Sequence, residues 1–92
     1  MSRPRGKRRL GGAPEAVFYK PQGVPLRLLQ TIEISLEEFE ALRLRYTKGL
    51  DQVTCAKKME TSQSTFQRIL AGAVERVSKA IVQGKAIRIA KE

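Results

Sequence analysis

The chain has 92 residues and a formal net charge of +9, from 18 Lys and Arg against 9 Asp and Glu. It contains no His and one Cys, which excludes an intramolecular disulfide, a Cys-His nucleophile pair and a Ser-His-Asp triad, and which leaves no ligand set for a zinc site. No apolar run reaches the roughly 20 residues that a membrane-spanning helix needs, so we expect one small cytoplasmic domain, with no membrane partner, that favours phosphate-rich ligands.

The N-terminal segment, residues 1–12, is predicted to be a flexible basic arm. It contains five cationic side chains and no acid within its first nine residues, and glycines add backbone freedom. The cations are Arg3, Arg5, Lys7, Arg8 and Arg9. We expect this arm to follow DNA phosphates or to enter a minor groove, and the alternative is a solubilising tail.

Residues 13–92 are predicted to form a single domain that begins with an extended segment. Three prolines exclude a helix from its first part, because each removes a backbone donor and fixes its own φ. They are Pro14, Pro21 and Pro25. A turn is expected near Gly23. We expect Phe18 and Tyr19 to pack on the core, in preference to stacking on bases.

Two short strands are predicted from alternating apolar residues. Ile32 and Ile34 alternate with polar neighbours, and Ile87 and Ile89 do the same near the end of the chain. The two segments could pair with each other in one chain, or with the equivalent segments of a partner.

The first helix is predicted over residues 35–48. Ser35 and Glu38 form a capping box, and Gly49 suits the left-handed residue that follows a helix end. Four apolar residues recur at helical spacing and predict the buried face. They are Leu36, Phe39, Leu42 and Tyr46. The alternating Glu and Arg residues are expected to lie on a solvated face, so this helix is interpreted as scaffold.

The second helix is predicted over residues 51–59, with Asp51 as its N-cap. Its inward-facing residues are expected to be Val53, Ala56 and Met59, and Cys55 is expected to be a small core residue. Glu60 follows where a helix-turn-helix usually carries glycine. If this turn requires a left-handed backbone, Glu60 costs about 1 kcal/mol there.

The third helix is predicted over residues 62–83 and carries the candidate DNA-reading face. Residues of its buried stripe include Phe66 and Ile69, so the outward face near its start contains polar side chains. Those expected to contact bases are Gln63, Ser64, Gln67 and Arg68. Gln and Arg can form bidentate hydrogen bonds with adenine and guanine, and recognition helices read bases near their N-terminal end. Expected backbone contacts are Thr65, Lys58 and Lys57. The alternative is an ordinary solvated face of an all-α core.

Several segments match a known family in order along nearly the whole chain. They are Arg3–Arg5 with Arg8–Arg9, Phe18–Leu26, Glu38–Leu44, Gly49–Leu50, Ser62–Leu70 and Gly84–Ile89. The chain resembles an uncharacterised family of small bacterial and archaeal proteins predicted to bind DNA through a helix-turn-helix similar to region four of sigma factors. The resemblance implies that fold and that activity. This chain differs where family members often have Arg, at Gln63, and Gly, at Glu60, so no family operator sequence can be transferred.

The combined prediction is a mainly α, helix-turn-helix protein that binds double-stranded DNA selectively and regulates transcription. Two alternatives remain: a protein-interaction module that contacts RNA polymerase, and a basic RNA-binding protein. No metal, cofactor or enzymatic activity is expected, because no acid-base or nucleophile constellation exists. We also expect a homodimer, because the apolar residues of 73–82 and the terminal strand need a covering partner. The competing account is that residues 18–29 fold back over the same stripe.

Overall fold

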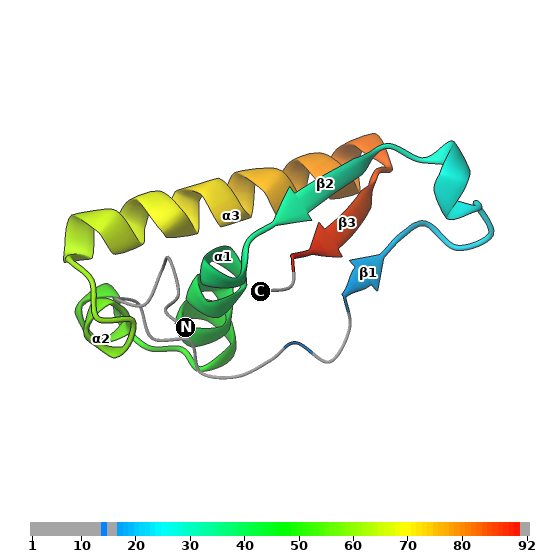
Figure 1. Cartoon of the computed structure of the whole chain (residues 1–92). Helices are drawn as coiled ribbons and strands as arrows, with labels where there is room; N and C mark the ends of the chain where they lie inside the picture. Colours follow the sequence, from blue (N-terminus) through cyan, green and yellow to red (C-terminus); the bar gives the residue numbers. More distant parts are fainter. Residues whose placement is uncertain (1–13, 15–16, 91–92) are drawn as a thin grey trace, which may run out of the picture.

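The structure is a computed structural model that describes residue 14 and residues 17–90, and it confirms a mainly helical fold with short strands. The longest helix, α3 (Gln63–Gln83), extends along one side of the molecule (Figure 1). Helices α2 (Gln52–Lys58) and α1 (Leu36–Leu42) pack against its first part and middle, and two of the strands lie along its second half (Figure 1). None of the described helices is long and apolar enough to cross a bilayer.

The three described strands form one sheet in the order β1-β3-β2. Their bounds are Phe18–Tyr19 for β1, Thr31–Ile34 for β2 and Ala86–Ile89 for β3. β3 lies in the centre, parallel to β2 and antiparallel to β1. The two predicted strands therefore pair with each other inside one chain.

Strand β1 was not expected from the sequence. Phe18 and Tyr19 were expected to pack on the core, and this prediction is wrong, because 43% and 55% of their surfaces stay exposed. Both residues lie at the edge of the sheet, where a two-residue strand has a neighbour on one side only. A short turn of 3-10 helix, η1 (Leu26–Leu28), and a turn containing Gly23 (φ 83°) connect β1 to β2.

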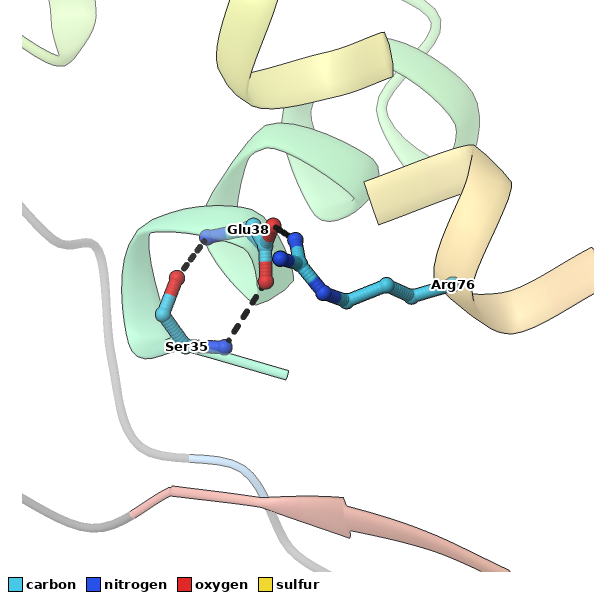
Figure 2. Close-up of polar contacts among 3 residues, drawn as sticks. All are labelled: Ser35, Glu38 and Arg76. Atoms are coloured by element: carbon cyan, nitrogen blue, oxygen red, sulfur yellow. Dashed lines mark hydrogen bonds and ion pairs between the residues drawn. The ribbon is translucent and has the colours of Figure 1, made fainter. Parts of the chain in front are cut away.

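Helix α1 begins with the predicted capping box. Ser35 Oγ accepts from the Glu38 amide at 3.1 Å, and Glu38 Oε1 accepts from the Ser35 amide at 3.0 Å (Figure 2). The helix continues beyond Leu42 as a π-helical turn, η2 (Arg43–Thr47), in which the Lys48 amide donates to the Arg43 carbonyl at 2.8 Å. Gly49 then adopts the predicted left-handed conformation, with φ 74°.

The buried face of the first helix differs from the predicted one. Glu38 and Glu40, expected on a solvated face, are buried, whereas Tyr46 of the predicted apolar stripe is 61% exposed. Glu40 accepts two hydrogen bonds from the Arg43 guanidinium, each of 2.8 Å, and such charge-assisted bonds allow a carboxylate to be buried. The π-helical turn changes the rotation per residue, so the stripe does not continue beyond Leu42, and Leu44 enters the core instead.

Glu38 also forms an ion pair across the helix interface with Arg76 of α3 (Figure 2). Gly72 lies directly beside this pair, and a Cβ atom at Gly72 would lie 3.0 Å from Glu38 Oε2 and 3.3 Å from Arg76 Nη1. The absence of a side chain at this helical position therefore gives the ion pair its space.

The main core lies where α1, η2, α2 and α3 meet. Its residues are Ala41, Leu44, Cys55, Ala56, Met59, Phe66 and Leu70. The expected core positions of Cys55, Ala56 and Met59 are confirmed, whereas Val53 was expected to face inward and is half exposed. Burial raises the pKa of the Cys55 thiol, so this side chain acts as a small core residue with little thiolate.

The turn between α2 and α3 places Glu60 in the left-handed region, with φ 57°. It is the one described non-glycine residue with positive φ. The Thr61 amide donates to the Ala56 carbonyl at 3.0 Å, and the Glu60 amide donates to the Lys57 carbonyl at 3.1 Å. These two bonds are the Schellman pattern, in which glycine is preferred at the left-handed position.

Glu60→Gly should therefore increase the free energy of unfolding by about 0.5–1 kcal/mol. Glycine removes the free-energy cost of holding a side-chain-bearing residue in the left-handed conformation. Part of this gain is lost because glycine has more conformational freedom in the unfolded chain. Urea unfolding measures it. The control is Glu75→Gly, which makes the same change on the exposed part of α3 and should destabilise by about 1 kcal/mol. Equal losses in both variants would contradict strain at Glu60.

Candidate nucleic-acid interface

The first turns of α3 carry the polar face that the sequence predicted. Ser62 is the N-cap, and its Oγ accepts from the Thr65 amide at 3.1 Å. Phe66 and Leu70 face the core, so the helical period turns the intervening polar residues outward. The four residues expected to contact bases are all exposed: Gln63, Ser64, Gln67 and Arg68. The structure therefore brings them together on one accessible face, and their contact with bases remains a prediction.

The residues expected to contact the DNA backbone have different surroundings. Lys57 and Lys58 are exposed in the last turn of α2, beside the turn that leads into α3. Thr65 is half-buried, and its hydroxyl accepts from Ser62 Oγ at 2.9 Å, so it takes part in the helix cap. The predicted basic arm, residues 1–12, lies outside the described residues.

A contact between α2 and α3 adds Gln52 to the candidate site, and the sequence analysis did not predict this residue. Gln67 Nε2 donates to Gln52 Oε1 at 2.6 Å, across the turn that joins the two helices. Gln52 is half-buried and is the first residue of α2, whereas Gln67 is exposed. The two residues are 15 positions apart. No spacing rule within one helix could therefore have indicated their contact.

The position of Gln52 is set by the N-cap that precedes it. Asp51 Oδ1 accepts from the Thr54 amide at 2.8 Å, as the predicted cap requires. This hydrogen bond lowers the pKa of the Asp51 carboxyl, so the cap is ionised at neutral pH. The cap thereby stabilises the first turn of α2, which contains Gln52.

A shallow hollow of about 410 Å³ lies next to the glutamine pair. Gln52 and Gln67 line it together with Tyr46 and Val74, which are partly exposed apolar side chains. The Arg45 guanidinium carbon lies 5.5 Å from the centre of the Tyr46 ring, within the range of a cation–π contact. The hollow therefore combines two amide groups with an aromatic ring and the Glu75 carboxylate, and Arg45 contacts the ring without lining the hollow.

Hydrogen bonding to an external ligand is the chemistry that these side chains offer. The face supplies amide donors and acceptors, a hydroxyl and a guanidinium, which are the groups that read base edges. In the described part of the chain, no group of three or more His, Cys, Asp or Glu residues is placed to hold a metal ion.

Comparison with known proteins places the chain among uncharacterised relatives. A UPF0251 protein of Halothermothrix orenii is 47% identical over 88 residues, which cover 96% of this chain and 65% of that protein. A UPF0251 protein of Desulforudis audaxviator is 46% identical over 89 residues, covering 97% and 58%. UPF0251 protein DET0218 of Dehalococcoides mccartyi is 46% identical over 89 residues, covering 97% and 76%. The chain thus spans less than two thirds of the length of the first two relatives.

No solved structure matches the chain. A family model described as "Protein of unknown function DUF134" matches residues 1–91. That match covers nearly the whole sequence and agrees with the relatives above, so the chain belongs to the DUF134/UPF0251 family of uncharacterised bacterial proteins.

Proposed function

We propose that this protein binds double-stranded DNA selectively and regulates transcription, with the first half of α3 in the major groove. The observation that carries the proposal is the exposed face of Gln63, Gln67 and Arg68 at the start of α3. These side chains face away from Phe66 and Leu70, which hold the helix on the core. Placing α3 in a groove would therefore leave the core intact.

The length of α3 and the position of α2 agree with this proposal. α3 has 21 residues, which makes it about 30 Å long, whereas the major groove is about 12 Å wide. Only the first turns of the helix can contact bases, and those turns carry the polar face. α2 lies across the start of α3, with Lys57 and Lys58 exposed beside it. In helix-turn-helix proteins the first helix crosses the DNA backbone while the second lies in the major groove, and we propose these two positions for α2 and α3.

Charge supports DNA as the partner. The net charge of +9 favours association with phosphates, and five of the positive charges lie in the N-terminal arm. We propose that this arm adds affinity that does not depend on sequence. Its removal would then weaken binding to every duplex and reduce the dependence of binding on salt.

Arg68→Ala should separate sequence selectivity from general affinity. A preferred site is first selected from random duplexes, and affinities for that site and for random DNA are then measured at several salt concentrations. Loss of a bidentate contact should cost about 1–3 kcal/mol on the preferred site and relax the preference at one base. The control is Lys79→Ala, which removes an exposed cation from the second half of α3 and should leave the base preference unchanged.

Two results would contradict the proposal in different ways. Full discrimination by the Arg68→Ala protein would show that this part of α3 does not read the bases. Failure of the native protein to select any sequence would reject selective DNA binding itself.

Two of the reasons for expecting a homodimer do not apply to the folded chain. β3 is paired on both sides within the chain, and Ala73 is fully buried, so neither needs a partner. The remaining apolar surface is at the end of α3, where Ile81 is 70% exposed and Val82 is 83% exposed. We propose that two copies pair through this surface. Such pairing would make the preferred site a near-palindrome with half-sites about one helical turn apart.

Sedimentation equilibrium at micromolar concentration tests this pairing. The native protein should sediment as a dimer, and the doubly substituted Ile81→Ser, Val82→Ser protein should sediment as a folded monomer, because the exposed apolar surface is lost. A monomeric native protein that binds DNA as one copy per site would contradict the dimer.

A further inference from the structure

We infer that Gln52 is a positioning residue, which orients the amide of Gln67 so that this side chain selects adenine. The inference rests on the proposed DNA-binding function and goes beyond it, because it names the base and the residue that determines the choice. Its basis is the 2.6 Å hydrogen bond from Gln67 Nε2 to Gln52 Oε1.

The two ends of a glutamine amide have opposite hydrogen-bonding character. The orientation of the amide therefore determines which base it can recognise. The carbonyl oxygen only accepts, and the NH₂ group only donates, with two hydrogens. Adenine offers a donor at N6 beside an acceptor at N7, and it therefore needs both the oxygen and one hydrogen of the amide. Guanine offers two acceptors, O6 and N7, and is matched by two donors.

The observed hydrogen bond leaves Gln67 with the groups that adenine needs. One hydrogen of Nε2 is used by Gln52, so Oε1 and the second hydrogen remain for a ligand. The opposite orientation would direct Oε1 of Gln67 toward Gln52 and leave two hydrogens for the ligand. That arrangement would match guanine in place of adenine.

Gln52 is suited to hold this orientation because it is the less exposed of the two residues. It is half-buried at the start of α2, directly after the Asp51 cap, whereas Gln67 is exposed. A free glutamine at the surface would lose rotamer freedom on binding a base, and the contact with Gln52 reduces that loss beforehand.

Two substitutions at residue 52 test the inference, because they control which end of the Gln67 amide can face residue 52. Gln52→Glu supplies only acceptors, and it should keep the observed orientation. Gln52→Lys supplies only donors, and it should turn the oxygen of Gln67 inward. Gln52→Met keeps a similar size without either group and serves as the matched control. Thermal unfolding of each protein, followed by circular dichroism, establishes that it is folded.

The measurement is the preference between adenine and guanine at one position of the selected site. That position is identified as the one where Gln67→Ala abolishes discrimination. The native protein and Gln52→Glu should prefer adenine by about tenfold, as one bidentate contact allows. Gln52→Met should lose most of this preference, and Gln52→Lys should move it toward guanine.

Overall affinity for DNA provides an independent readout. The charge introduced at residue 52 should change this affinity in the direction opposite to the expected change in adenine preference. Gln52→Glu adds a negative charge and should weaken binding to all duplexes, although it keeps the adenine preference. Gln52→Lys should strengthen binding to all duplexes, although it loses that preference. A purely electrostatic or structural role for Gln52 would change affinity and leave base choice unaltered.

The outcomes separate this inference from the proposed function. If the native protein selects a sequence and Gln52→Lys keeps the native base preference, Gln52 does not orient Gln67 and the inference is rejected alone. If the native protein shows no selectivity for any duplex, both the proposed function and the inference are rejected.

Discussion

Replacing Phe66 with alanine is expected to lower the free energy of unfolding by about 3–5 kcal/mol. The ring is fully buried in the cluster that joins the first, second and third helices. Removing it takes away apolar contacts and leaves a cavity in the cluster that also contains Met59, Cys55 and Leu70. A loss of this size is a large fraction of the total stability of a small domain, which is about 5–15 kcal/mol.

Chemical denaturation measures this effect, and the neighbouring residue provides the control. Gln67→Ala changes an exposed side chain on the same turn of α3, so it should change the free energy of unfolding by no more than about 0.5 kcal/mol. If Gln67→Ala were as destabilising as Phe66→Ala, the outward face of α3 would be wrongly assigned. The proposed reading face would then be wrong as well.

Replacing Glu38 with alanine is expected to lower the free energy of unfolding by about 2 kcal/mol. Its carboxylate accepts from the Ser35 amide at the start of α1 and from Arg76 of α3, so one side chain caps a helix and joins it to another. The cap contributes about 1 kcal/mol. The ion pair adds a similar amount, because Glu38 is buried although the Arg76 side chain is half exposed.

A second ion pair in the same molecule is the matched control. Glu33 and Arg88 face each other across the sheet at 3.5 Å, and both side chains are exposed. Glu33→Ala should therefore cost no more than about 0.5 kcal/mol. A double-mutant cycle on Glu38 and Arg76 should give a coupling free energy larger than the cycle on Glu33 and Arg88. Equal coupling in the two cycles would show that burial of Glu38 adds nothing to its contact with Arg76.

The features that could be predicted from the sequence depend on residues close together in the chain. The Ser35 capping box, the Asp51 cap and the left-handed Gly49 each involve at most four consecutive residues, and each is present. The outward face of the third helix follows from its 3.6-residue period alone. Local geometry therefore determines the helix ends and the exposure of the candidate site.

The features that were missed depend on contacts between distant residues. Burial of Glu38 requires Arg76, which is 38 positions away, and the space that Gly72 provides for both. The contact of Gln52 with Gln67 depends on how α2 and α3 cross, and the left-handed turn at Glu60 determines that crossing. No periodic pattern in one segment contains this information.

The position of β3 has a consequence for how the chain folds. It is the last of the described strands in sequence, but it is the central strand of the sheet, and β1 and β2 pair with it and not with each other. Residues paired between β2 and β3 lie 55 positions apart, whereas the helices meet through contacts between closer segments. The sheet must therefore form late, after residues 86–89 have left the ribosome. A chain cut before residue 86 would contain all residues of the described helices and would lack the partner of both outer strands.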